Sequence, residues 1–250
     1  IVVFPRYQLA DKLRTPGDTM YSGASSAVQD AWNLLIAHGP VRPQTDKIAW
    51  IGHSMGGVLS INLAAAAPSL GLPPAGSVFL VQPGGQDVVP LGDLSALPTD
   101  AVVEIMVGDE DSLAGDSGAK AIREALSGTP GRRLELLKMR SERRSRPALV
   151  ADHFAPLGTV DDFPPVNIVG GDTDQPGGRL RDRIREHRQK GHALDALDYY
   201  GFWKVGDALL DATFRGQNLQ FGFGNTDQQR FMGTLSDGTP VIPLVVEPAQ

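Results

Sequence analysis

The residues of this chain best suited to chemistry lie in Gly52–Gly56 (GHSMG), a G-x-S-x-G pattern. The apolar run Lys47–Ile51 before it suits a buried strand, and Val58–Ala67 after it is rich in residues that favour helices. A strand that turns abruptly into a helix at a serine is a nucleophile elbow, which exposes the hydroxyl at the carboxyl end of a sheet. Both glycines of the pattern are expected to let the helix cross the strand without Cβ clashes. The pattern and its flanks predict Ser54 as a nucleophile rather than a serine that only caps a helix.

A serine hydroxyl is a weak nucleophile at neutral pH, so it needs a neighbouring base, and the base needs a carboxylate to orient it. An acidic segment, Gly108–Asp111 (GDED), follows the apolar run Val102–Val107, and a histidine lies in Asp152–Phe154 (DHF), after the last predicted strand. Loops at the carboxyl ends of parallel strands meet at one edge of the sheet, where ligands bind in such folds. The sequence therefore predicts His153 as the base and Asp111 as the orienting acid.

The choice of acid has alternatives. Asp109 is either a turn residue or the acid itself, whereas Asp111 lies three residues after the glycine that ends the strand. Asp87 and Asp93 follow an earlier predicted strand and remain further candidates. All four aspartates are compatible with a loop at the same edge of the sheet.

The choice of base also has alternatives, because the chain has five histidines. His53 precedes the serine, but at an elbow its side chain is expected to point away from the hydroxyl and to pack behind the site. The other three end a predicted helix or lie in a basic stretch: His38, His187 and His192.

Strands and helices alternate along the chain, which predicts an α/β fold with a mostly parallel sheet, helices on both faces and a single domain. The predicted strands are Ile1–Phe4, Ile48–Ile51, Val78–Val81, Val102–Val107 and, as the final strand, Leu134–Met139. The predicted helices are Ser22–His38, Ser54–Ala67, Gly118–Leu126 and Leu194–Phe214. The aromatic residues of the last helix are expected in the core, and Phe231–Val246 is expected to form a hairpin around Asp237-Gly238.

The motifs GHSMGG, VGDEDS and DHF resemble those of the α/β-hydrolase superfamily, in detail the dienelactone hydrolase and carboxylesterase branch, over about residues 1–157. The order serine, acid, histidine along the chain is also that of the superfamily. The resemblance implies Ser54 as nucleophile, His153 as base, Asp111 as acid and the Met55 amide as one oxyanion donor. It implies no cofactor and no metal.

The same resemblance makes Ile1–Phe4 the fourth strand of the fold, so the first strands and the second oxyanion donor are expected upstream of Ile1. The chain has no initiator Met, which favours its being the carboxyl-terminal part of a longer protein. Residues 1–157 are expected to form the core of the one domain, with an insertion at 158–192 and a helix and tail at 193–250.

The resulting functional hypothesis is a serine hydrolase that cleaves carboxylic esters, small or polymeric, through an acyl-enzyme on Ser54. A thioesterase or acyltransferase would use the same three residues, and a non-catalytic binding protein on the same fold is the alternative of a different class.

The composition of the chain limits the classes of partner that we expect it to bind. The net charge of −6 argues against nucleic acid, no apolar run reaches the length of a membrane span, and the chain has no cysteine. These properties leave the compartment open. Two basic runs, Lys138–Arg146 and Arg179–Lys190, are expected to be solvated surface, and Asp172–Asp174 is expected to be a loop rather than a calcium site.

Overall fold

The structure is a computed structural model that describes residues 1–7, 16–158 and 194–248. A five-stranded sheet with the order β1-β2-β3-β4-β5 is its centre. Strands β1 (Ala49–His53), β2 (Ser77–Val81), β3 (Val102–Gly108) and β4 (Arg133–Met139) are parallel, and β5 (Val245–Pro248) runs antiparallel to β4. The predicted α/β class with a mostly parallel sheet is confirmed.

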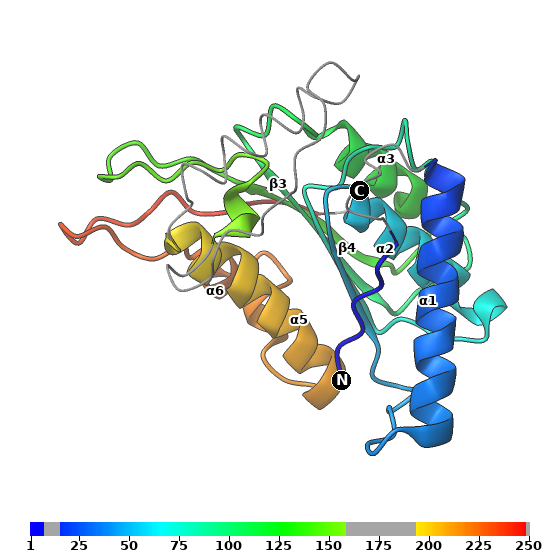
Figure 1. Cartoon of the computed structure of the whole chain (residues 1–250). Coiled ribbons are helices and arrows are strands. Elements are labelled where there is room, and N and C mark those ends of the chain that lie inside the picture. Colours follow the sequence, from blue (N-terminus) through cyan, green and yellow to red (C-terminus); the bar gives the residue numbers. More distant parts are fainter. Residues whose placement is uncertain (8–15, 159–193, 249–250) are drawn as a thin grey trace.

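Helices cover both faces of the sheet (Figure 1). On one face lie α1 (Gly17–His38), α2 (Met55–Ala66) and α3 (Ser117–Ser127). On the other face lies α5 (Lys204–Arg215), which continues the π-helix η3 (Leu197–Trp203). Short helices complete the described chain: η1 (Ala67–Leu70), η2 (Ala155–Leu157), η4 (Leu219–Phe221) and α6 (Asp227–Arg230).

The central strands β2 and β3 are mainly apolar on both faces because both of their faces are buried. In β2 and β3, Leu80 and Ile105 pack in the core shared with α2 and α3, whereas Phe79 and Met106 pack in the core shared with α5. Successive strand residues point to opposite faces, so one continuous apolar run serves two cores. This burial fixes the carboxyl ends of the strands, where the candidate site lies.

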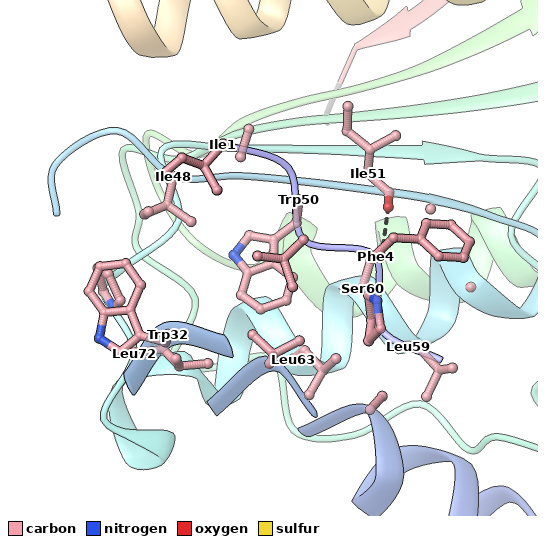
Figure 2. A pocket seen from close by; sticks show the side chains of 18 of the residues that line it. Ile1, Phe4, Trp32, Ile48, Trp50, Ile51, Leu59, Ser60, Leu63 and Leu72 are labelled. Carbon is pink, nitrogen blue, oxygen red and sulfur yellow. Dashed lines mark hydrogen bonds between the residues drawn. The ribbon is translucent and has the colours of Figure 1, made fainter. Parts of the chain in front are cut away.

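The prediction of a strand at Ile1–Phe4 is wrong. This segment has no regular secondary structure and belongs to no sheet, and Val2 and Phe4 are 92% and 91% exposed. A strand is stabilised by pairing, and among the described residues β1 pairs only with β2. Figure 2 shows Ile1 and Phe4 of this segment beside Trp50. All three residues line a hollow with a volume of about 530 Å³.

Two predictions for the end of the chain are also wrong. Strand β4 is not the final strand, because β5 pairs with it along its outer edge. In place of the expected hairpin there is a turn closed by the bridge between Thr234 and Pro240. Val245 and Val246 belong instead to β5 and pair with β4. The C-terminal tail thereby covers an edge that the sequence left open.

The predicted helix Leu194–Phe214 corresponds to η3 and α5 together. Its aromatic residues divide: Phe202 is buried, whereas Tyr199, Tyr200 and Trp203 are each at least 39% exposed, contrary to the expectation. A helix packed on a sheet buries one stripe only, so side chains on its other face remain in solvent.

The predicted insertion at 158–192, the loop Asp172–Asp174 and the basic run Arg179–Lys190 lie almost wholly outside the described residues. The other basic run is exposed as expected at Arg140 and Arg143, which pair with acidic side chains. In the described parts of the chain, no helix combines the length and the apolar character that crossing a membrane requires.

Candidate active site

Ser54 lies at the sharp turn between β1 and α2, with φ 55° and ψ −128°. A positive φ is unfavourable for a residue with a side chain, so the neighbouring structure must hold it. The Ser54 amide donates to the Val81 carbonyl at 2.9 Å, which ties the turn to β2. A Cβ on Gly52 would lie 2.2 Å from the Gly56 carbonyl oxygen, so the close crossing of strand and helix requires this glycine. A Cβ on Gly56 would make only a 3.4 Å contact, so the expected need for the second glycine is not met.

A continuous chain of hydrogen bonds joins the three residues expected to act together. His153 Nε2 lies 2.8 Å from Ser54 Oγ, and His153 Nδ1 lies 2.8 Å from Asp111 Oδ2. The carboxylate can only accept, so Nδ1 carries the proton and the neutral ring presents Nε2 as acceptor for the serine hydroxyl. The predicted hydrogen bonds of His153 to both partners are therefore present.

Asp111 is buried, and both oxygens of its carboxylate form hydrogen bonds. Its other oxygen, Oδ1, accepts from the amides of Leu113 and Ala114 at 2.9 and 2.8 Å. Burial alone would raise the pKa of Asp111, but the hydrogen bonds from His153 and the Ala114 amide outweigh it and leave that pKa below its ordinary value. The carboxyl group therefore stays ionised at neutral pH, as an orienting acid must.

Asp109 takes part in a separate network. Its Oδ1 accepts from the Ser141 amide at 2.9 Å and from the Ser141 hydroxyl at 2.7 Å, and its Oδ2 accepts from Arg140 Nε at 3.2 Å. The Ser141 hydroxyl oxygen in turn accepts from the Ala151 amide at 3.0 Å. Asp109 thus supports the loop that carries His153 and is not its partner. The two further candidates, Asp87 and Asp93, are exposed.

His53 does more than pack behind the site. Its Nε2 lies 2.9 Å from the carbonyl oxygen of His153, and the two imidazole rings are 4.8 Å apart. Burial, followed by the charge that His153 would carry, lowers the pKa of His53 to about 4. Of the other histidines, His38 is exposed at the end of α1, and His187 and His192 lie outside the described residues.

Gln82 is a site residue that the sequence reasoning missed. It follows the last residue of β2, is 1% exposed, has φ 47°, and its Nε2 donates to the Asp152 carbonyl at 2.6 Å. A polar residue directly after an apolar strand was the available signal, since such residues lie at the edge where the loops gather.

The Met55 amide belongs to the first residue of α2. The first amides of a helix have no acceptor within the helix, so this N–H is available to a group outside it. No three His, Asp or Glu side chains in the described ranges are grouped so that they could hold a metal ion.

No family model matches the chain, and no curated protein matches it. Among solved structures, the chain is similar to MGS-M1, an α/β-hydrolase enzyme from a Medee basin deep-sea metagenome library, at 21% identity and a TM-score of 0.40, covering 65% of this chain and 62% of that one. It is also similar to Est2, a thermophilic esterase from Thermogutta terrifontis, at 18% identity and a TM-score of 0.38, covering 54% and 57% of the two chains. The chain thus spans less than two thirds of either structure, and these likenesses are too low for an activity to be carried over.

The chain's own geometry defines the fold as that of the α/β hydrolases. It has a mostly parallel sheet between two layers of helices, with a serine at the elbow between β1 and α2. The described sheet begins at β1, so the strands that precede the elbow strand in that fold have no counterpart among the described residues.

Proposed function

We propose that this chain is a carboxylic ester hydrolase that works through an acyl-enzyme on Ser54, with His153 as general base and Asp111 as orienting acid. The observation that carries the proposal is the chain of two 2.8 Å hydrogen bonds from the elbow serine through His153 to a buried, ionised carboxylate. A nucleophile, a base within hydrogen-bond reach and an orienter for the base are the components that acyl transfer requires.

In the proposed reaction, Ser54 Oγ attacks the ester carbonyl carbon while its proton passes to His153 Nε2. The imidazolium, stabilised by Asp111, then gives this proton to the leaving alcohol oxygen as the carbon–oxygen bond breaks. Water attacks the resulting acyl-enzyme with His153 again as base, which releases the acid and restores the hydroxyl. No cofactor takes part in these steps.

The negative charge of the tetrahedral intermediate needs hydrogen-bond donors. The Met55 amide is the donor that we assign to it, because it follows the nucleophile directly and has no acceptor within α2. One such donor contributes about 3 kcal/mol to stabilising the transition state.

The proposal is tested by labelling the protein with a fluorophosphonate and by measuring hydrolysis of short-chain aryl esters. Native chain should be labelled and Ser54→Ala should not. Ser54→Ala and His153→Ala should each remove nearly all turnover, because the three residues act as a unit. Turnover that persists undiminished in Ser54→Ala would refute the acyl-enzyme, and a native chain that is neither labelled nor active would favour a binding protein.

A further inference from the structure

Three successive main-chain carbonyls of the histidine loop, Ala151–His153, each accept a hydrogen bond from the end of a different strand or the loop after it. The Ala151 carbonyl accepts from the Glu110 amide at 3.1 Å, the Asp152 carbonyl from Gln82 Nε2 at 2.6 Å, and the His153 carbonyl from His53 Nε2 at 2.9 Å. Glu110 follows β3, Gln82 follows β2 and His53 ends β1. The backbone at His153 is thus held by hydrogen bonds from the carboxyl ends of three neighbouring strands.

Two of the three donors are side chains with little freedom to move. Gln82 is 1% exposed, and its main-chain N–H donates to the Met106 carbonyl at 2.6 Å. His53 is the last residue of β1, which pairs with β2 up to this position. Side chains held on strand ends are more precise supports than side chains on loops.

Both side chains also supply an N–H without supplying a charge. A carbonyl can only accept, so His53 must carry its proton on Nε2, and its pKa of about 4 keeps the ring neutral at neutral pH. A cation at this place, with its ring 4.8 Å from that of His153, would disfavour the imidazolium that forms during catalysis. A neutral imidazole and an amide hold the loop without this cost.

We propose that His53 and Gln82 are positioning residues for His153: their hydrogen bonds to the carbonyls of His153 and Asp152 fix the backbone of the base relative to Ser54. The proposal rests on the proposed function and extends it to two residues that do not touch the reacting atoms. General base catalysis requires the base nitrogen within about 2.6–3.2 Å of the oxygen whose proton it removes, so a loop that drifts lowers the rate more than it weakens substrate binding.

The central experiment compares His53→Phe with His53→Gln. Phenylalanine keeps a ring beside His153 but has no donor, whereas glutamine places an N–H near the position of Nε2. We expect kcat for a short aryl ester to fall about 10- to 100-fold in His53→Phe with little change in KM, and to recover most of the native value in His53→Gln. His38→Phe, at an exposed histidine on α1, is the matched control and should keep the native kcat.

Gln82→Met provides a second route to the same result, because it removes the donor and keeps the length of the side chain. It should lower kcat in the same way, and it replaces His53→Phe if that variant fails to fold in a thermal denaturation experiment. Native kcat in His53→Phe or, where that variant does not fold, in Gln82→Met would overturn the proposal. Equal losses in His53→Phe and His53→Gln would do the same, since they indicate a packing role.

A spectroscopic readout separates this proposal from the proposed function. The proton that Asp111 holds on His153 Nδ1 gives a far-downfield NMR signal when its exchange with water is slow. This signal should broaden in His53→Phe and return in His53→Gln, whether or not the protein hydrolyses an ester. A native chain without turnover or labelling would refute the proposed function alone, whereas an unchanged signal in His53→Phe would refute the positioning role alone.

Discussion

Asp109 and Asp111 lie two residues apart, yet the structure gives them different surroundings. Asp111 faces His153, and Asp109 faces Ser141 and Arg140. Gly108 makes this arrangement possible, because a Cβ there would lie 2.1 Å from the Ala151 carbonyl oxygen. The acidic loop therefore touches the histidine loop through a glycine, and the two carboxylates diverge from that contact.

Asp111→Asn should keep the fold and lose most of the activity. The asparagine can present its N–H to His153 and favour the wrong tautomer, in which Nε2 carries the proton and cannot accept that of Ser54. We expect kcat to fall by about 10⁴-fold, as in serine proteases with this change. Steady-state kinetics beside circular dichroism would check this, and a kcat near the native value would exclude Asp111 as the orienting acid.

Asp109→Asn is the matched change and should affect stability more than rate. It weakens the charge-assisted hydrogen bonds to Ser141 and Arg140, a loss of about 1–3 kcal/mol in the free energy of unfolding. Urea denaturation measures this loss, and kcat should fall far less than in Asp111→Asn. If Asp109→Asn lost most of the activity and Asp111→Asn lost mainly stability, Asp109 would be the orienting acid.

The three proposed catalytic residues could be predicted from sequence because each lies in the turn or loop that follows an apolar strand, and parallel strands bring such loops together. The roles of His53 and Gln82 could not be predicted in the same way. Their partners are main-chain carbonyls, which every residue has, so nothing in the local sequence indicates which carbonyl lies within reach. That information exists only once the histidine loop has been placed in space.

At the scale of strands, β3 and β4 carry a pair of facing carboxyl groups inside the protein. Glu104 and Glu135 are register partners, and Glu104 is completely buried. Glu135 accepts from Gln229 Nε2 at 2.8 Å, whereas neither side-chain oxygen of Glu104 has a hydrogen-bond partner among the described residues. Burial and, second, the neighbouring charge of Glu135 raise the pKa of Glu104 well above its ordinary value.

The burial of Glu104 beside Glu135 predicts that the stability of the folded protein depends on pH. Because the pKa of Glu104 is higher in the folded than in the unfolded chain, folding is favoured by the protonated form, so this contribution is complete below the unfolded pKa of about 4.3. It is lost as the pH rises toward the folded pKa. Glu104→Gln should remove the dependence, since a glutamine side chain is neutral at every pH. Thermal melting should show the variant more stable than the native chain at pH 8 and similar to it at pH 4; equal melting temperatures at pH 8 would contradict this.

The elements also show where pattern reasoning is insufficient. Ile1–Phe4 is as apolar as a buried strand, but a strand exists only with a partner, and no described strand pairs with it, although it lies beside β1. At Val245–Pro248 the pattern failed in the opposite direction, because this short segment was not expected as a strand of the sheet. It nevertheless pairs with the outer edge of β4. Composition sets a preference for extended backbone, and long-range pairing decides whether it becomes part of a sheet.

At the scale of the whole chain, the two edges of the described sheet differ. β5 covers one edge, while the other, along β1, borders the apolar hollow that is lined in part by Phe4, Trp50 and Leu63 (Figure 2). Ile51 on this edge strand is 53% exposed. An apolar strand edge without a pairing partner is a known route to association between chains.

The described chain should therefore self-associate in solution in a concentration-dependent way. A lysine at the edge opposes strand pairing, so Ile51→Lys should reduce the association seen by sedimentation velocity. Leu34→Lys, at an exposed leucine of α1, introduces the same charge elsewhere and should leave the association as it is. A native chain that sediments as a monomer at every concentration would contradict the prediction.

The three hydrogen bonds that hold Ala151–His153 have a consequence for how such a chain can evolve. All three donors precede the histidine in sequence, at Glu110, Gln82 and His53, so the position of the base is set before the chain continues past Leu157. Segments after Leu157 can therefore vary without removing any of these three hydrogen bonds, as long as Leu197, Phe202 and Val205 keep the core that they share with Ala151 and Ala155. Changes in those segments can therefore accumulate at a different rate from changes at the proposed catalytic residues, within a single fold.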